Sequence, residues 1–238
     1  MRGLVFLAGL FGVFAGVVTV STPAGAAQSP SLSPSALEAK AIQDAEGSSW
    51  VHEVVHSNAA GQTFTATNDV GTFEGRQVIA QNASRAEVIV IGQEAYIQGN
   101  ASAIENFFGL TKNDPQQLAN TWISMVPADG QGYQTVSAAV TLKSDFTDQT
   151  IPSPVMEGRP VTVDGHRCIP LTGHSTQPTV GKVTITMYVT DSSKPLPIET
   201  KSTAAAKKGQ SITTWSRWGQ QVTLNPPPGA VPISTLNL

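Results

Sequence analysis

The residues with the clearest potential for chemistry stand at positions 52–56, His-Glu-Val-Val-His. They match the pattern H-E-x-x-H, in which two imidazoles chelate zinc and the glutamate activates the bound water. That chemistry needs a helix, because only there do positions i and i+4 stand close together on one face. A secreted zinc metallopeptidase using His52, Glu53 and His56 is therefore one hypothesis that the sequence raises.

The neighbouring residues favour a strand over a helix. β-branched residues and a tryptophan dominate positions 50–55, and no helix-capping pattern precedes Glu53. In a strand, His52 and His56 would lie about 13 Å apart at ~3.3 Å per residue, too far for one zinc ion. We therefore predict a strand over residues 50–57. We expect no metal site, no cofactor, no catalytic residues and no enzymatic activity.

Composition narrows the remaining function classes. The chain has 238 residues, of which 13% are charged and one is cysteine, and its formal net charge is −3. A single cysteine excludes an intramolecular disulfide scaffold and a cysteine-based zinc ribbon. An acidic balance without a basic run argues against nucleic acid as the main partner. Because few residues are charged, the surface of the protein must be largely neutral. The sequence leaves open which partner this neutral surface contacts.

The N-terminal residues have the layout of an export signal. Arg2 precedes an uncharged apolar run over residues 4–20, and small residues follow at 24–27. This pattern predicts a secretory signal peptide over residues 1–27. The 17-residue run (20 − 4 + 1) is also about long enough to span a bilayer, so an uncleaved anchor is the alternative. Because the sole cysteine, Cys168, lies far downstream, we expect an exported protein without lipidation, extracellular or in the cell envelope.

The exported part is predicted to be one domain between a polar linker and an extended tail. Residues 28–35 form a polar linker interrupted by proline, residues 36–225 a single domain, and residues 226–238 a proline-rich extended tail. Ser35 with Glu38 forms a capping box that predicts a helix ending at Gly47.

After the first helix the apolar period changes to two, which predicts strands. The expected strands are 50–57, 63–67, 73–81, 86–91, 95–98, 159–172, 182–190, 197–204 and 211–224. Helices are expected between the two groups of strands, over 101–108, from Pro115 toward Trp122, and over 133–146. The fold class is therefore α+β. Its long antiparallel sheet curls into a half-barrel, and its helices cover the concave face.

Five local features, in this order, resemble a family of lipid carriers. They are residues 48–52 after the first helix, the turn at 71–75, the strand pair at 88–97, the segments 121–123, 187–191 and 195–198, and the closing residues 218–224 before Pro226 and Pro227. The arrangement resembles the LolA/LolB-type lipid-carrier superfamily, in its actinobacterial LppX/LprG-like branch. Members of that branch usually carry a lipid-modified cysteine at the end of the signal, and this chain has none there.

The resemblance implies a non-enzymatic protein that holds acyl chains in a hydrophobic cavity between sheet and helices. Candidate residues lining the cavity are Val88, Val90, Tyr96, Phe107, Phe108, Leu118, Trp122, Val183, Ile185, Met187 and Ile198. Plain core packing is the alternative for each of them. A structural or protein-interaction module with a filled core is accordingly the alternative function. The expected partner is a lipid or acyl chain, contact with a membrane is left open, and no protein partner is indicated.

Overall fold

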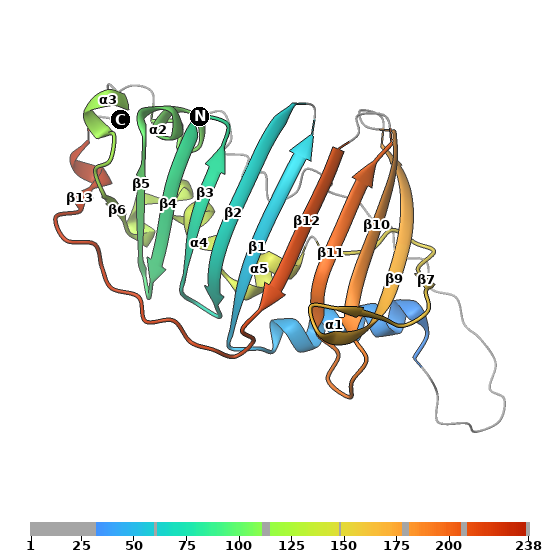
Figure 1. Cartoon of the computed structure of the whole chain (residues 1–238). Helices are drawn as coiled ribbons and strands as arrows, with labels where there is room; N and C mark the ends of the chain where they lie inside the picture. The colour runs from blue at the N-terminus through green and yellow to red at the C-terminus, as the bar shows by residue number, and fades with distance from the viewer. Residues whose placement is uncertain are drawn as a thin grey trace.

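The computed structural model describes residues 32–59, 61–110, 115–147, 149–177, 181–205 and 209–236. The predicted signal segment at 1–27 and the first half of the predicted linker, residues 28–31, lie outside these residues. The described part confirms the α+β class: a long sheet curls without closing into a barrel, and helices lie on its concave face (Figure 1). The strand predicted around the His-Glu-Val-Val-His segment is confirmed as β1.

The sheet of the described residues has thirteen strands. Their bounds are β1 Trp50–Ala59, β2 Gln62–Gly71, β3 Gly75–Gln81, β4 Ser84–Ile91, β5 Glu94–Gly99, β6 Ile123–Met125, β7 Met156–Glu157, β8 Val161–Val163, β9 His166–Gln177, β10 Gly181–Thr190, β11 Pro197–Ala204, β12 Gly209–Ser216 and β13 Val231–Pro232. The order across the sheet is β13-β6-β5-β4-β3-β2-β1-β12-β11-β10-β9-β7, and β8 pairs with β9 beside β7.

The first five strands form the predicted antiparallel meander. Each pairs with the next in sequence, and three of the connecting turns hold a residue with positive φ, at Gly61, Asn82 and Gly92. Glycine and asparagine adopt this backbone conformation most readily, so the turn residues set the register of the hairpins. Strand β12 then pairs with β1 and joins the second group of strands to the first.

Several predicted boundaries in the second half were wrong. The predicted strand at 159–172 is two strands, β8 and β9, because Asp164 and Gly165 form a positive-φ turn between them. The last predicted strand, 211–224, ends at Ser216, where Arg217 has positive φ. The tail was expected to stay unpaired, yet Val231 and Pro232 run parallel to β6, with the Val231 N–H donating to the Trp122 carbonyl.

The helices are α1 Pro34–Glu46, α2 Ala101–Asn106, α3 Pro115–Leu118, α4 Gln131–Ala138 and α5 Leu142–Thr147, with short 3₁₀ turns at Pro127–Asp129 and Ile233–Thr235. Ser33 caps α1, rather than Ser35 as predicted, and Pro34 occupies its first turn. The single helix predicted at 133–146 is divided because Thr141 bridges to Gly71 of the sheet and its hydroxyl accepts from the Ser144 N–H.

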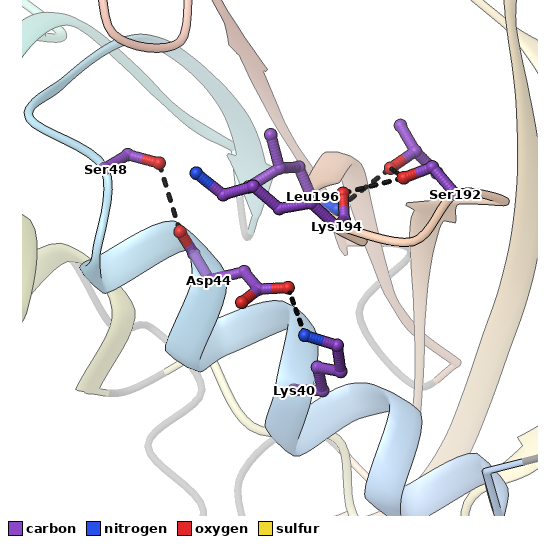
Figure 2. Close-up of polar contacts among 7 residues, drawn as sticks. Lys40, Asp44, Ser48, Ser192, Lys194 and Leu196 are labelled. Atoms are coloured by element: carbon purple, nitrogen blue, oxygen red, sulfur yellow. Dashed lines mark hydrogen bonds and ion pairs between the residues drawn. The ribbon is translucent and has the colours of Figure 1, made fainter.

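Helix α1 is fixed across the lower ends of β10 and β11 (Figure 1). Ala41 and Ala45 are fully buried on its sheet side, and the Glu38 carboxylate accepts from the Ile151 N–H. On its outer side Lys40 pairs with Asp44 at 2.8 Å. Figure 2 shows this pair beside the 190–196 turn that connects β10 to β11. Glu38 was predicted to serve the capping box; instead it ties the helix to the 149–155 loop.

That loop lies directly against β9, and Gly173 is the contact point. A Cβ atom at Gly173 would overlap the carbonyl oxygen of Pro152 and lie 2.6 Å from Ile151 Cγ2. The approach of the loop to the sheet therefore requires glycine at this position.

We predict that Gly173→Ala lowers the free energy of unfolding by about 1–3 kcal/mol, because the loop must move away from the sheet. Gly132→Ala is the control. A Cβ at Gly132 would lie 3.9 Å from Met125 Sδ, so alanine in helix α4 should raise stability by up to about 1 kcal/mol. Urea unfolding of both variants measures the difference, and equal effects would contradict the packing seen at Gly173.

Candidate functional site

The centre of the concave face carries a row of polar side chains. Strand register places Trp215 of β12 opposite Glu53 of β1, Glu53 opposite Asn68 of β2, and Asn68 opposite Gln77 of β3. Glu53, Asn68 and Gln77 are only 3%, 4% and 6% exposed. Buried polar groups are costly unless they are paired. In this row Asn68 Oδ1 and Gln77 Oε1 have no hydrogen-bond partner in the described structure, whereas Glu53 is paired.

Helix α5 brings an acid onto this row. The Asn68 side-chain amide donates to the Glu53 carboxylate, the Trp215 indole N–H donates to Asp145 Oδ2 at 3.3 Å, and the Glu53 and Asp145 carboxyl groups bond to each other. Burial raises the pKa of Glu53 well above its ordinary value and that of Asp145 to about 6. At neutral pH Glu53 therefore holds the proton and donates it to the Asp145 carboxylate.

Apolar packing fixes the same helix. Leu142 and Phe146 of α5 are buried with Val51 and Val70 of the sheet. The Phe146 ring lies 5.5 Å from Trp215 and 5.8 Å from Trp218, measured between ring centroids. Helix α5 is thus held at the middle of the sheet by an aromatic cluster and by the shared proton.

The three residues of the H-E-x-x-H pattern do not converge. Because β1 is extended, Glu53 faces the helices, whereas His52 and His56 face the outer surface. His52 Nδ1 lies 2.7 Å from Asp69 Oδ1 of the neighbouring strand, and His56 is exposed. The helix that zinc chelation requires is not formed. Over the residues that the structure describes, no group of three or more His, Cys, Asp or Glu side chains is placed to hold a metal ion.

Five of the eleven predicted lining residues meet at one end of the sheet. Val88 and Val90 of β4 pack with Phe108, Leu118 and the partly buried Phe107, and helices α2, α3 and α4 cover this cluster. Its other buried members include Ile97, Ile104, Ile123, Met125, Val136 and Val140. The chain's own side chains therefore fill the concave face at this end.

Three other predicted residues lie at the opposite end. Met187 packs with Ala41 of α1 and with Leu171 and Val189. Val183 and Ile185 form a separate buried cluster with Ala204. We call these last three residues the β10–β11 cluster. None of its members comes from a helix of the described chain, so it differs from the helix-covered end.

The remaining three predicted residues belong to neither group. Tyr96 pairs with Ile89 and faces the outer side of the sheet, opposite to Val88, and its hydroxyl bonds to Glu94. Trp122 is half-buried where the tail joins β6. Ile198 is buried at the start of β11. The eleven residues thus do not line one continuous surface.

The sequence reasoning did not identify the polar row or the hydroxyl groups near the β10–β11 cluster. Thr200 and Ser202 face the concave side of β11, where their register partners are Met187 and Ile185. The signal that could have revealed them is strand parity: Thr200 and Ser202 alternate with the charged Glu199 and Lys201. Glu53 likewise lies between His52 and Val54.

We predict that Glu53→Gln weakens the dependence of stability on pH. The native Glu53 carboxyl keeps a proton that the unfolded chain loses near its ordinary pKa of 4.5. The free energy of unfolding of the wild type must therefore fall as pH rises above that value. Glutamine holds no such proton, so the variant should lose at least about 1 kcal/mol less between pH 5 and pH 8.

Glu87→Gln is the matched control for this measurement. Glu87 pairs with Arg76 at 2.7 Å on the outer surface, so its loss should leave the pH profile of urea unfolding close to that of the wild type. Identical profiles for the two variants would contradict the shared proton.

Comparisons with known proteins bear on the fold. No protein-family model and no curated protein sequence matches the chain. Among solved structures, lipoprotein LppX of Mycobacterium tuberculosis is similar with a TM-score of 0.51 and 13% identity, over 81% of this chain and 98% of LppX. LprF from Mycobacterium bovis gives a TM-score of 0.50 and 17% identity, over 84% of this chain and all of LprF. The chain therefore has an LppX/LprF-like fold, as the resemblance in its sequence implied.

Proposed function

We propose that this protein is an exported, non-enzymatic lipid carrier whose concave face holds an acyl chain. The observation that carries the proposal is the contrast between the two ends of that face. Helices α2, α3 and α4 pack over β4–β6, whereas the β10–β11 cluster has no helix residue among its described members. An acyl chain would lie beside these buried residues, in the place that helices take at the other end.

The fold supports this proposal. A long curled sheet leaves a broad concave face that must be filled or occupied, and the sequence resembles a superfamily of lipid carriers. The apolar and the polar sides of β10 are cleanly separated: Val183, Ile185, Met187 and Val189 are buried, while threonine, tyrosine and lysine alternate with them. The apolar surface is thus turned inward.

Export remains part of the proposal. It rests on the signal-like residues 1–27, which the structure does not describe. In the described part of the chain, no helix has the length and apolar character needed to cross a membrane.

The packing near β4–β6 favours a second candidate, a structural or protein-interaction module without cargo. That end of the concave face is filled by the chain's own residues. In a module without cargo, the whole concave face would be filled in this way. The two functions differ in what copurifies with the protein and in whether it takes up acyl chains.

Lipid extraction with mass spectrometry tests the first function directly. Native protein purified from its own source, or exported by a related host, should yield acyl lipids in organic extracts, and the cargo-free protein should take up a fluorescent fatty acid. Absence of both would overturn the lipid-carrier proposal and leave the interaction module.

We predict that Ala204→Phe reduces binding of the fluorescent fatty acid by about tenfold, or ~1.4 kcal/mol, because the ring would occupy the proposed place of the acyl chain beside Val183. Thr203→Phe is the matched control. Thr203 is the preceding residue of β11 but is exposed on the outer face, so its substitution should leave binding unchanged. Equal losses in both variants would argue against an acyl chain at this position.

A further inference from the structure

The far end of the concave face carries hydroxyl groups as well as apolar side chains. Thr200 and Ser202 on β11 are 8% and 7% exposed, and Ser175 on β9 is partly exposed with a buried hydroxyl oxygen. All three face the helix side of the sheet: Ser202 lies opposite Ile185, Thr200 opposite Met187, and Ser175 opposite Val183. The three hydroxyls therefore border the β10–β11 cluster.

None of these three hydroxyl oxygens has a hydrogen-bond partner in the described structure. On the outer face of the same strands, hydroxyls do find partners: Thr172 bonds to Thr186 at 2.9 Å, and Thr184 lies 3.0 Å from His174 Nδ1. A buried hydroxyl without a hydrogen bond is unfavourable. Alanine or valine would suit a face that only packs against itself.

The charges on these strands lie elsewhere. Lys182, Glu199 and Lys201 alternate with the inward residues and therefore point to the outer face, where Lys201 pairs with Glu199 at 2.7 Å. The described inward residues of β10 and β11 are all uncharged. An anionic headgroup placed here would be buried without a cation, which is strongly unfavourable. Groups that form hydrogen bonds without carrying charge suit the site.

We infer that Thr200, Ser202 and Ser175 form a subsite for the uncharged, oxygen-rich part of an acyl lipid, its hydroxyl or ester groups. The inference rests on the proposed function and adds the class of lipid: neutral, and bearing hydrogen-bonding oxygens next to its chains. The chains lie along the β10–β11 cluster. The three side chains then gain the partners that they lack.

Matched lipids and near-isosteric variants test this subsite. The full chain is incubated with phosphatidylcholine vesicles containing dipalmitoylglycerol, dipalmitoylphosphatidic acid or hexadecane, then isolated, and the bound lipid is quantified by mass spectrometry. The first two share their chains and differ in charge, and hexadecane has no polar group. The wild type should take up dipalmitoylglycerol in preference to the phosphatidic acid.

Thr200→Val combined with Ser202→Ala should reduce uptake of dipalmitoylglycerol by about tenfold and leave uptake of hexadecane unchanged. Thr203→Val, on the exposed side of β11, is the control and should behave as the wild type. If the double variant does not fold, judged by thermal unfolding, Ser202→Ala alone gives the same comparison, with a smaller loss.

The outcomes separate the two proposals. Uptake of hexadecane without preference for the neutral lipid, or an unaltered preference in the variants, overturns the subsite and leaves the carrier intact. Preference for the phosphatidic acid also overturns the subsite. If the wild type takes up none of the three probes, the lipid-carrier function itself fails.

Discussion

The covering of one face of an open sheet is the constraint on which the rest of this structure depends. Thirteen strands, over the residues described, present a concave face on which the helices pack in separate groups. Helices α2, α3 and α4 close the end at β4–β6, α5 the centre, and α1 the lower part of β9 and β10. Every remaining inward side chain must be small, polar or provided with another partner. This unequal covering is what distinguishes a candidate binding surface from the core.

The buried acid pair is a second consequence of the same geometry. Glu53 and Asp145 stand where a helix must dock on the sheet but where Asn68 and Gln77 make the surface polar. Sharing a proton lets two carboxyl groups contact each other without mutual repulsion. An apolar pair could seal this position with less dependence on pH. The position of α5, midway between the filled end and the β10–β11 cluster, is thereby linked to a titratable group.

The sequence predicted the period-two strands and the meander because alternation and turn residues are local signals. The strand predicted at residues 50–57 is present, where a zinc motif would need a helix. The strand preference of the β-branched neighbours therefore outweighed the five-residue pattern match. The divided helix at 139–141 and the pairing of Val231 with β6 were missed, because long-range contacts with Gly71 and Trp122 decide them. Hydrophobicity does not distinguish Val88, which packs with residues of three helices, from Val183, whose buried cluster contains no helix residue among its described members. The polar row was not predicted because the contacts of Glu53 with Asn68 and Asp145 are not local in sequence.

The two edges of the sheet bear on how the protein behaves in solution. At one edge stands β13, two residues long, whose second residue is a proline that cannot donate a hydrogen bond. At the other, β7 and β8 are also very short, and both pair with β9. A sheet that ends in such fragments offers little template for strand addition by another copy. Where the outermost strands are this short, pairing with the edge of another copy is disfavoured despite the low charge of the chain.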